Sequence, residues 1–196
     1  LFFSPYSISA ALAASYAGAR GSTAAEMENV LYLDPDIHRS MSALISELNS
    51  VSDDIAEMDT ANAIWPAKQE KLLADYVDTV KNYYGAALIP LNYRASPEKA
   101  RKTINKWVEK QTHEKIKDLI GVGVLKKDTQ MVLTNAVYFR SDWLEKFEAG
   151  DSRVMPFWVA NDRSIPTLMM NKTSDRINYA KISGTEIAEL PYKDGR

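Results

Sequence analysis

The 196-residue chain contains no cysteine and only two histidines. Without cysteine, neither a disulfide framework nor a thiolate metal site can form. No apolar run approaches the roughly 20 residues that a membrane-spanning helix needs. The formal net charge is only -2, and the lysines and arginines form no block that would track a phosphate backbone. The composition therefore argues against a membrane or nucleic-acid partner and leaves the cellular compartment open.

The chain also lacks the residue constellations of common active sites. His38 lies in a polar linker and His113 lies near the end of a charged segment, so we expect both to be solvated. Ser4 and Ser7 flank a proline but lack the G-x-S-x-G motif of a nucleophile elbow. Gly121 and Gly123 lack the helix that follows a phosphate-binding loop. We therefore expect a protein that is not an enzyme and that has neither a cofactor nor a metal site.

What the chain does contain is a globular balance, with 45% hydrophobic and 26% charged residues. Ser4 before Pro5 is typical of a helix start, because the hydroxyl caps the first turn and proline lacks an N–H there. The same signals recur at Ser96-Pro97. Apolar residues at helical spacing predict helices over residues 5–18, 22–31, 39–48 and 69–84, and a further helix after Ser96.

Strand patterns lie between and after these helices. We expect strands at residues 54–65, 87–93, 129–140, 155–159, 165–170, 177–182 and 186–192. The segment 129–140 is apolar on both faces, which predicts a central strand with both sides covered. Helices with mixed strands first, and strands at the end, predict an α+β fold with more than one sheet.

Several segments resemble motifs of the serpin family, in the family's order and spacing. They are residues 3–9, 18–23 with Glu26-Met27, 62–65, 104–112 with Lys115-Ile116, 134–140 with Trp143 and Phe147, 165–170, and 189–192. The departures are Ser141 and Glu114, each at a position where glycine is usual in the family. The chain is identified by this resemblance as the N-terminal portion of a serpin.

The resemblance implies a single incomplete serpin domain over residues 1–196, from about helix B to the early strands of sheet B. The implied fold is α+β, with helices packed on a large central sheet and strands of two further sheets. The reactive-centre loop is expected outside this chain. The implied function is inhibition of serine endopeptidases, in which the cleaved loop inserts as a strand into the central sheet of a metastable native form. The alternative is a non-inhibitory serpin with a carrier, storage or chaperone role.

The resemblance also assigns roles to particular residues. They are Ser4, Ser7 and Asn135 in the "shutter" beneath the sheet, Trp143 in the "breach" where insertion begins, Thr134, Val137 and Phe139 on the strand beside the insertion gap, and Trp107 on the overlying helix. Core packing is the plainer interpretation of each. We favour packing for Trp107, and the shutter role for Asn135, because it is a polar residue inside an apolar strand.

The expected partner is a serine protease, with a cysteine protease as the alternative. The helix at 39–48 has Arg39 at its start and Glu47 near its end but no basic face, so we expect no heparin site there. We expect the complete protein to be a monomer, and extracellular rather than cytoplasmic. We also expect the isolated 196 residues not to fold alone, because strand 129–140 would expose an unpaired edge.

Overall fold

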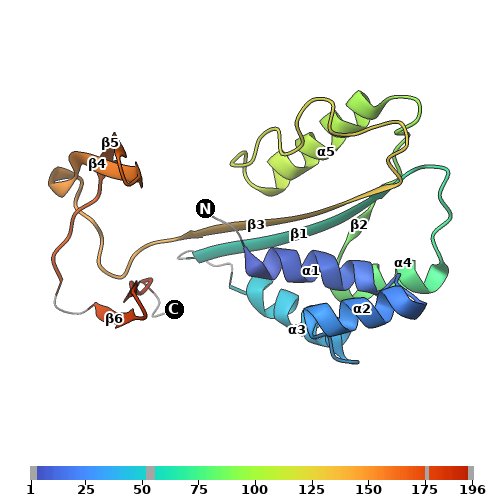
Figure 1. The fold of residues 1–196 in the computed structure, drawn as a ribbon, viewed down its shortest axis with the longest axis horizontal. Helices are drawn as coiled ribbons and strands as arrows, with labels where there is room; N and C mark the ends of the chain where they lie inside the picture. The colour runs from blue at the N-terminus through green and yellow to red at the C-terminus, as the bar shows by residue number, and fades with distance from the viewer. Residues whose placement is uncertain (1–3, 52–55, 175–176, 194–196) are drawn as a thin grey trace. The chain divides into compact units, whose positions relative to one another are not determined.

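The computed structural model describes residues 4–51, 56–174 and 177–193 (Figure 1). The helices are α1 (Pro5–Tyr16), α2 (Gly21–Leu31), α3 (Ile37–Asn49), α4 (Ala74–Tyr84) and α5 (Pro97–Gln111). The strands are β1 (Ala56–Pro66), β2 (Ala87–Leu88), β3 (Met131–Ser141), β4 (Arg153–Ala160), β5 (Arg163–Met169), β6 (Asn178–Ile182) and β7 (Thr185–Glu189). The chain forms two compact units, Leu1–Asp53 with Glu57–Phe139, and Asp54–Ala56 with Arg140–Arg196.

The larger unit is built on a three-stranded sheet in the order β2-β1-β3. Strands β1 and β2 are parallel, with Ala63 opposite Ala87. Just past the end of β1, the Ala67 N–H donates to the carbonyl of Gln130 over 2.7 Å, which ties the start of β3 to β1. Within the described chain, β3 therefore has a strand neighbour on one side only.

Helices cover both faces of this sheet: α5 lies over one face, and α1 to α4 gather on the other (Figure 1). The core under α5 comprises Ala63, Trp65, Ala67, Tyr93, Ala100, Ile104, Val108, Leu125 and Ala136. The core on the opposite face comprises Ala13, Ala14, Ile45, Ile64, Tyr76, Val80, Tyr84 and Ala86, with Leu133 packed against it. Neighbouring residues of β1 and β3 enter opposite cores because strand side chains alternate between faces.

Local sequence signals account for the helix ends. The Ser4 hydroxyl caps α1 and accepts a hydrogen bond from the Ser7 N–H at 3.1 Å. Helix α4 ends at Gly85, whose φ of 57° is the left-handed conformation that glycine adopts without strain. Helix α5 starts with proline at its first position and buries one stripe that includes Ile104 and Val108.

Three expectations from the sequence need correction. The helix expected from residue 69 begins at Ala74, and the strand expected at 87–93 is only the two residues of β2. Strand β3 was expected at the centre of a sheet with both sides covered; cores do cover both faces, but β3 ends the described sheet, and Phe139 is 43% exposed. The strand expected at 54–65 is confirmed as β1 from Ala56, and its first two expected residues lie outside the described residues.

The smaller unit contains two antiparallel hairpins. Strands β4 and β5 pair with Pro156 opposite Pro166, and β6 pairs with β7 from Asn178–Glu189 to Ile182–Thr185. The β6–β7 turn has positive φ at Ser183 and Gly184, as a tight hairpin turn requires. Nowhere in the described residues is a helix long and apolar enough to cross a membrane.

Candidate functional site

Asn135 links β3 to the layer of helices α1 to α4. Its amide nitrogen donates to the Asn62 side-chain oxygen at 2.7 Å, and the Asn62 amide nitrogen donates to the Tyr84 carbonyl at 3.0 Å. The chain of bonds runs from β3 through β1 to the C-terminal end of α4. The Asn135 side-chain oxygen is buried and accepts no hydrogen bond within the described structure. A buried amide with one unused acceptor is costly unless another group meets it.

The two serines expected beside Asn135 form a hydrogen bond with each other at the start of α1. Ser4 caps the helix by accepting from the Ser7 N–H, and both side chains are partly buried. Among the residues that the structure describes, no hydrogen bond joins either serine to Asn135. The structure thus pairs the serines with each other and Asn135 with Asn62. The shutter role of all three stays a prediction.

On the opposite face of β3, Thr134 is held by the buried indole of Trp65. The Trp65 Nε1–H donates to the Thr134 hydroxyl at 2.9 Å, and the Tyr93 hydroxyl donates to the Trp65 carbonyl at 2.7 Å. Burial raises the pKa of Tyr93 to about 12. Trp107 of α5 packs edge-on against Trp65, with ring centroids 5.4 Å apart and an interplanar angle of 85°. Trp107 thus makes a packing contact between α5 and β1, and its role on the overlying helix stays a prediction.

Trp65 was not among the residues expected to form the site, although it is fully buried and contacts Thr134, Tyr93 and Trp107. The signal that could have found it was the motif at 62–65, in which the tryptophan is the largest side chain. Val137 and Phe139 share the strand face of Asn135, and Val137 is partly buried. Their place beside an insertion gap stays a prediction.

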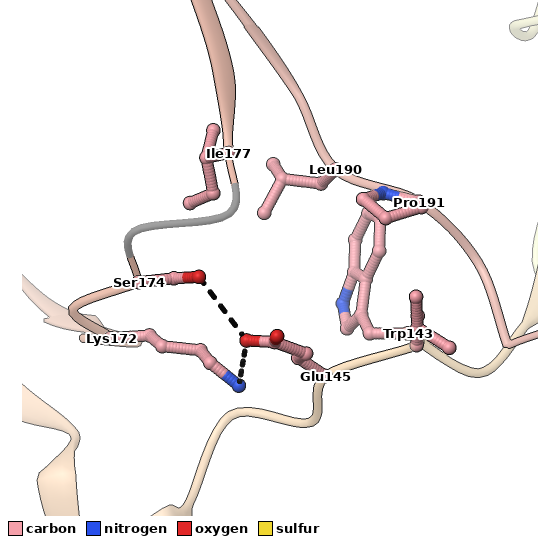
Figure 2. Close-up of a pocket in the computed structure, with 8 residues that line it drawn as sticks. Trp143, Glu145, Lys172, Ser174, Ile177, Leu190 and Pro191 are labelled. Carbon is pink, nitrogen blue, oxygen red and sulfur yellow. Dashed lines mark hydrogen bonds and ion pairs between the residues drawn. The ribbon is translucent and has the colours of Figure 1, made fainter.

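Trp143 belongs to the smaller unit and stacks on Tyr192, with ring centroids 4.8 Å apart and planes 12° apart. The Leu144 N–H donates to the Pro191 carbonyl at 2.9 Å. Trp143 and Pro191 border a pocket of about 290 Å³ (Figure 2). On its other side, Lys172 and Ser174 converge on the carboxylate of Glu145, as Figure 2 shows, at 3.2 and 3.3 Å. Trp143 thus joins two separate segments, while its breach role remains a prediction.

The expectation that both histidines are solvated is wrong for His38 and holds for His113, whose side chain is 46% exposed although it contacts other residues. His38 is partly buried, its Nδ1 lies 2.7 Å from the Tyr84 hydroxyl, and its ring stacks on Tyr16 at 5.8 Å. Burial lowers the pKa of His38. His113 Nε2 lies 3.1 Å from an Asp59 carboxylate oxygen, and its ring packs on Tyr138 at 4.2 Å. Both rings have long-range partners that spacing along the chain cannot reveal.

The geometry defines a class of fold: an α+β unit whose sheet is covered by helices on both faces. Residues 1–196 match the model of the family described as serpin (serine protease inhibitor). The chain is 36% identical over 198 residues to the leukocyte elastase inhibitor of Xenopus tropicalis, covering 99% of this chain and 52% of that protein.

Two solved structures are similar to the chain. Ovalbumin from emu matches with a TM-score of 0.89 and 27% identity, covering 100% of this chain and 55% of that one. A loop-inserted, P1-P1' cleaved ovalbumin mutant matches with a TM-score of 0.75 and 28% identity, covering 97% and 54%. The chain belongs to the serpin family, has an incomplete serpin fold, and spans about half the length of these relatives.

Proposed function

We propose that the complete protein inhibits serine proteases, and that its cleaved reactive loop inserts as a new strand beside β3. Family membership supports protease inhibition in general, and a similar protein is named a leukocyte elastase inhibitor. The single observation that carries the mechanism is the position of β3, which ends the described sheet β2-β1-β3. A terminal strand offers its outer backbone groups to a further strand.

The side-chain contacts of β3 would allow a strand to insert beside it. Thr134 ties one face of the strand to Trp65 on β1, and Asn135 ties the other face to Asn62 on the same strand. Because both bonds lead to β1, they lie on the side away from the proposed insertion edge. A strand could therefore add to β3 without breaking either bond.

The test is incubation of the complete protein with a panel of serine proteases and one cysteine protease. We expect an SDS-resistant complex with at least one active serine protease, and none with the same protease after its catalytic serine is replaced. Loop cleavage should also raise the unfolding temperature, since an inserted strand adds backbone hydrogen bonds. Clean cleavage with neither a complex nor a gain in stability would contradict the proposal and favour a carrier, storage or chaperone role.

The proposal includes an extracellular monomer that acts by binding rather than as an enzyme. A composition without cysteine is compatible with either the extracellular or the cytoplasmic compartment. Fractionation of the producing cells separates these alternatives, and the mass of the complete protein in solution tests the monomer. The proposal does not extend to a heparin site on α3, where Arg39 pairs with Asp36 at 3.8 Å.

A further inference from the structure

Three potential metal ligands meet beyond the C-terminal end of α5. Glu57 and Asp59 lie two residues apart on β1, so their side chains leave the same face of the strand. That face is the one covered by α5, because Ala63 and Trp65 follow in the same alternation. His113 Nε2 lies 3.1 Å from an Asp59 oxygen and 3.5 Å from a Glu57 oxygen. The three ligand atoms all lie within 4.8 Å of one another.

The backbone holds His113 in this position. Helix α5 is followed by Thr112, whose hydroxyl donates to the Val108 carbonyl at 2.9 Å and accepts from the Ile116 N–H at 3.1 Å. His113 and Glu114 then adopt left-handed φ values of 48° and 63°, which are uncommon for residues other than glycine. Glu114 is one of the two positions where glycine was expected, and its positive φ explains that preference. The tight turn aims the imidazole back at β1.

A second contact fixes the ring itself. The Tyr138 ring of β3 packs against the His113 ring, with centroids 4.2 Å apart and planes at 33°. Tyr138 lies on the same face of β3 as Thr134, which is the face under α5. The imidazole is therefore held between a turn and a strand before any ion binds, which lowers the entropy lost on binding.

Two of the three separations suit one small cation. Zinc bonds of about 2.0–2.2 Å to nitrogen and oxygen place tetrahedral ligands about 3.4 Å apart, close to the two measured separations from Nε2. A divalent cation would attract the imidazole nitrogen and both carboxylates at once. We propose that Glu57, Asp59 and His113 bind a divalent transition-metal ion, Zn²⁺ in particular, with water as a further ligand.

Such an ion would join the segment leaving α5 to β1. Resting on the proposed function, we infer that bound Zn²⁺ holds α5 against the sheet and slows insertion of a strand beside β3. The ion would thus regulate the rate of inhibition without contacting the protease.

The binding test uses the complete protein stripped of metal, titrated with Zn²⁺ by calorimetry and with Co²⁺ by visible absorption. We expect one saturable site in the parent protein. His113→Gln and Asp59→Asn should each weaken it by about 100-fold or more, since losing even a ligand's hydrogen-bond partner costs about 10–100-fold. The matched control is His38→Gln, which removes the other histidine and should leave binding unchanged. Absence of saturable binding, or undiminished binding by His113→Gln, overturns the site.

A second readout separates this inference from protease inhibition. Hydrogen exchange of the last turn of α5 should slow when Zn²⁺ binds the parent protein and stay unchanged in His113→Gln. If the protein forms no protease complex but binds Zn²⁺ with this protection, the metal site stands and the proposed function fails. If it inhibits proteases at a rate that saturating Zn²⁺ does not alter, the regulatory inference fails.

Discussion

Replacing Thr134 with valine tests whether the polar contact between β3 and Trp65 stabilises the sheet. The Thr134 hydroxyl accepts the Trp65 indole N–H at 2.9 Å, and both residues are buried, at 7% and 0% exposure. Valine keeps the branched shape of threonine but offers no acceptor, so the indole N–H would be buried without a partner.

The magnitude follows from two opposing effects. An orphaned buried donor costs about 1–3 kcal/mol. The methyl group that replaces the hydroxyl returns up to about 0.8 kcal/mol through burial. We therefore expect Thr134→Val to lower the free energy of unfolding by on the order of 1–2 kcal/mol. Thr134→Ser, which keeps the hydroxyl, should keep the hydrogen bond and lose only the packing of one methyl group.

The assay is the first urea-unfolding transition of the complete protein. It is measured for the parent, for Thr134→Val, for Trp65→Phe and for the variant that carries both changes. Phenylalanine removes the donor, so Thr134→Val should cost close to nothing in that background. Contacting residues in such cycles couple by about 0.5–3 kcal/mol, whereas independent sites add within about 0.5 kcal/mol. Additive effects of Thr134→Val and Trp65→Phe would show that the bond does not stabilise the sheet and would refute this reasoning.

Two further perturbations address the core under α5. Ile104→Ala removes a fully buried side chain and should lower the free energy of unfolding by about 2–5 kcal/mol, while Lys106→Ala on the exposed side of α5 should stay within about 0.5 kcal/mol. The pKa of Tyr93 is 10.0 in the unfolded chain and about 12 in the folded protein. Its contribution to the free energy of unfolding is therefore complete below pH 10 and is lost as the pH rises toward 12. Urea unfolding at stepped pH should show this decline, and Tyr93→Phe should remove most of it; an unchanged slope would assign the decline to other groups.

Local signals explain which elements could be predicted from the sequence. Helix α5 was predictable because Ser96-Pro97 marks its start and because Ile104 and Val108 repeat at helical spacing. The start of α4 was not, since Leu72 fits the same spacing yet packs against the core from a non-helical segment. The strand at 87–93 was overextended across Pro90, which has no N–H to donate to a neighbouring strand.

The residues of the candidate site also differ in whether the local sequence could reveal them. Asn135 could be singled out because a polar residue inside an apolar strand contrasts with its neighbours. The cluster around His113 could not, because its partner Asp59 lies 54 residues away and only the turn after α5 brings them together. His38 and its partner Tyr84 are likewise 46 residues apart in the sequence.

The two polar ties of β3 determine which part of the larger unit can give way. Thr134 and Asn135 are adjacent, yet they point to opposite faces, and each bonds a side chain of β1. Sliding β3 along β1 or separating the two strands would break both bonds and expose both cores. We therefore expect β1 and β3 to move together during any strand insertion. The helices must then move to admit the new strand. On the α5 side, the packing of Trp107 on Trp65 and the contact of His113 with Asp59 oppose this movement.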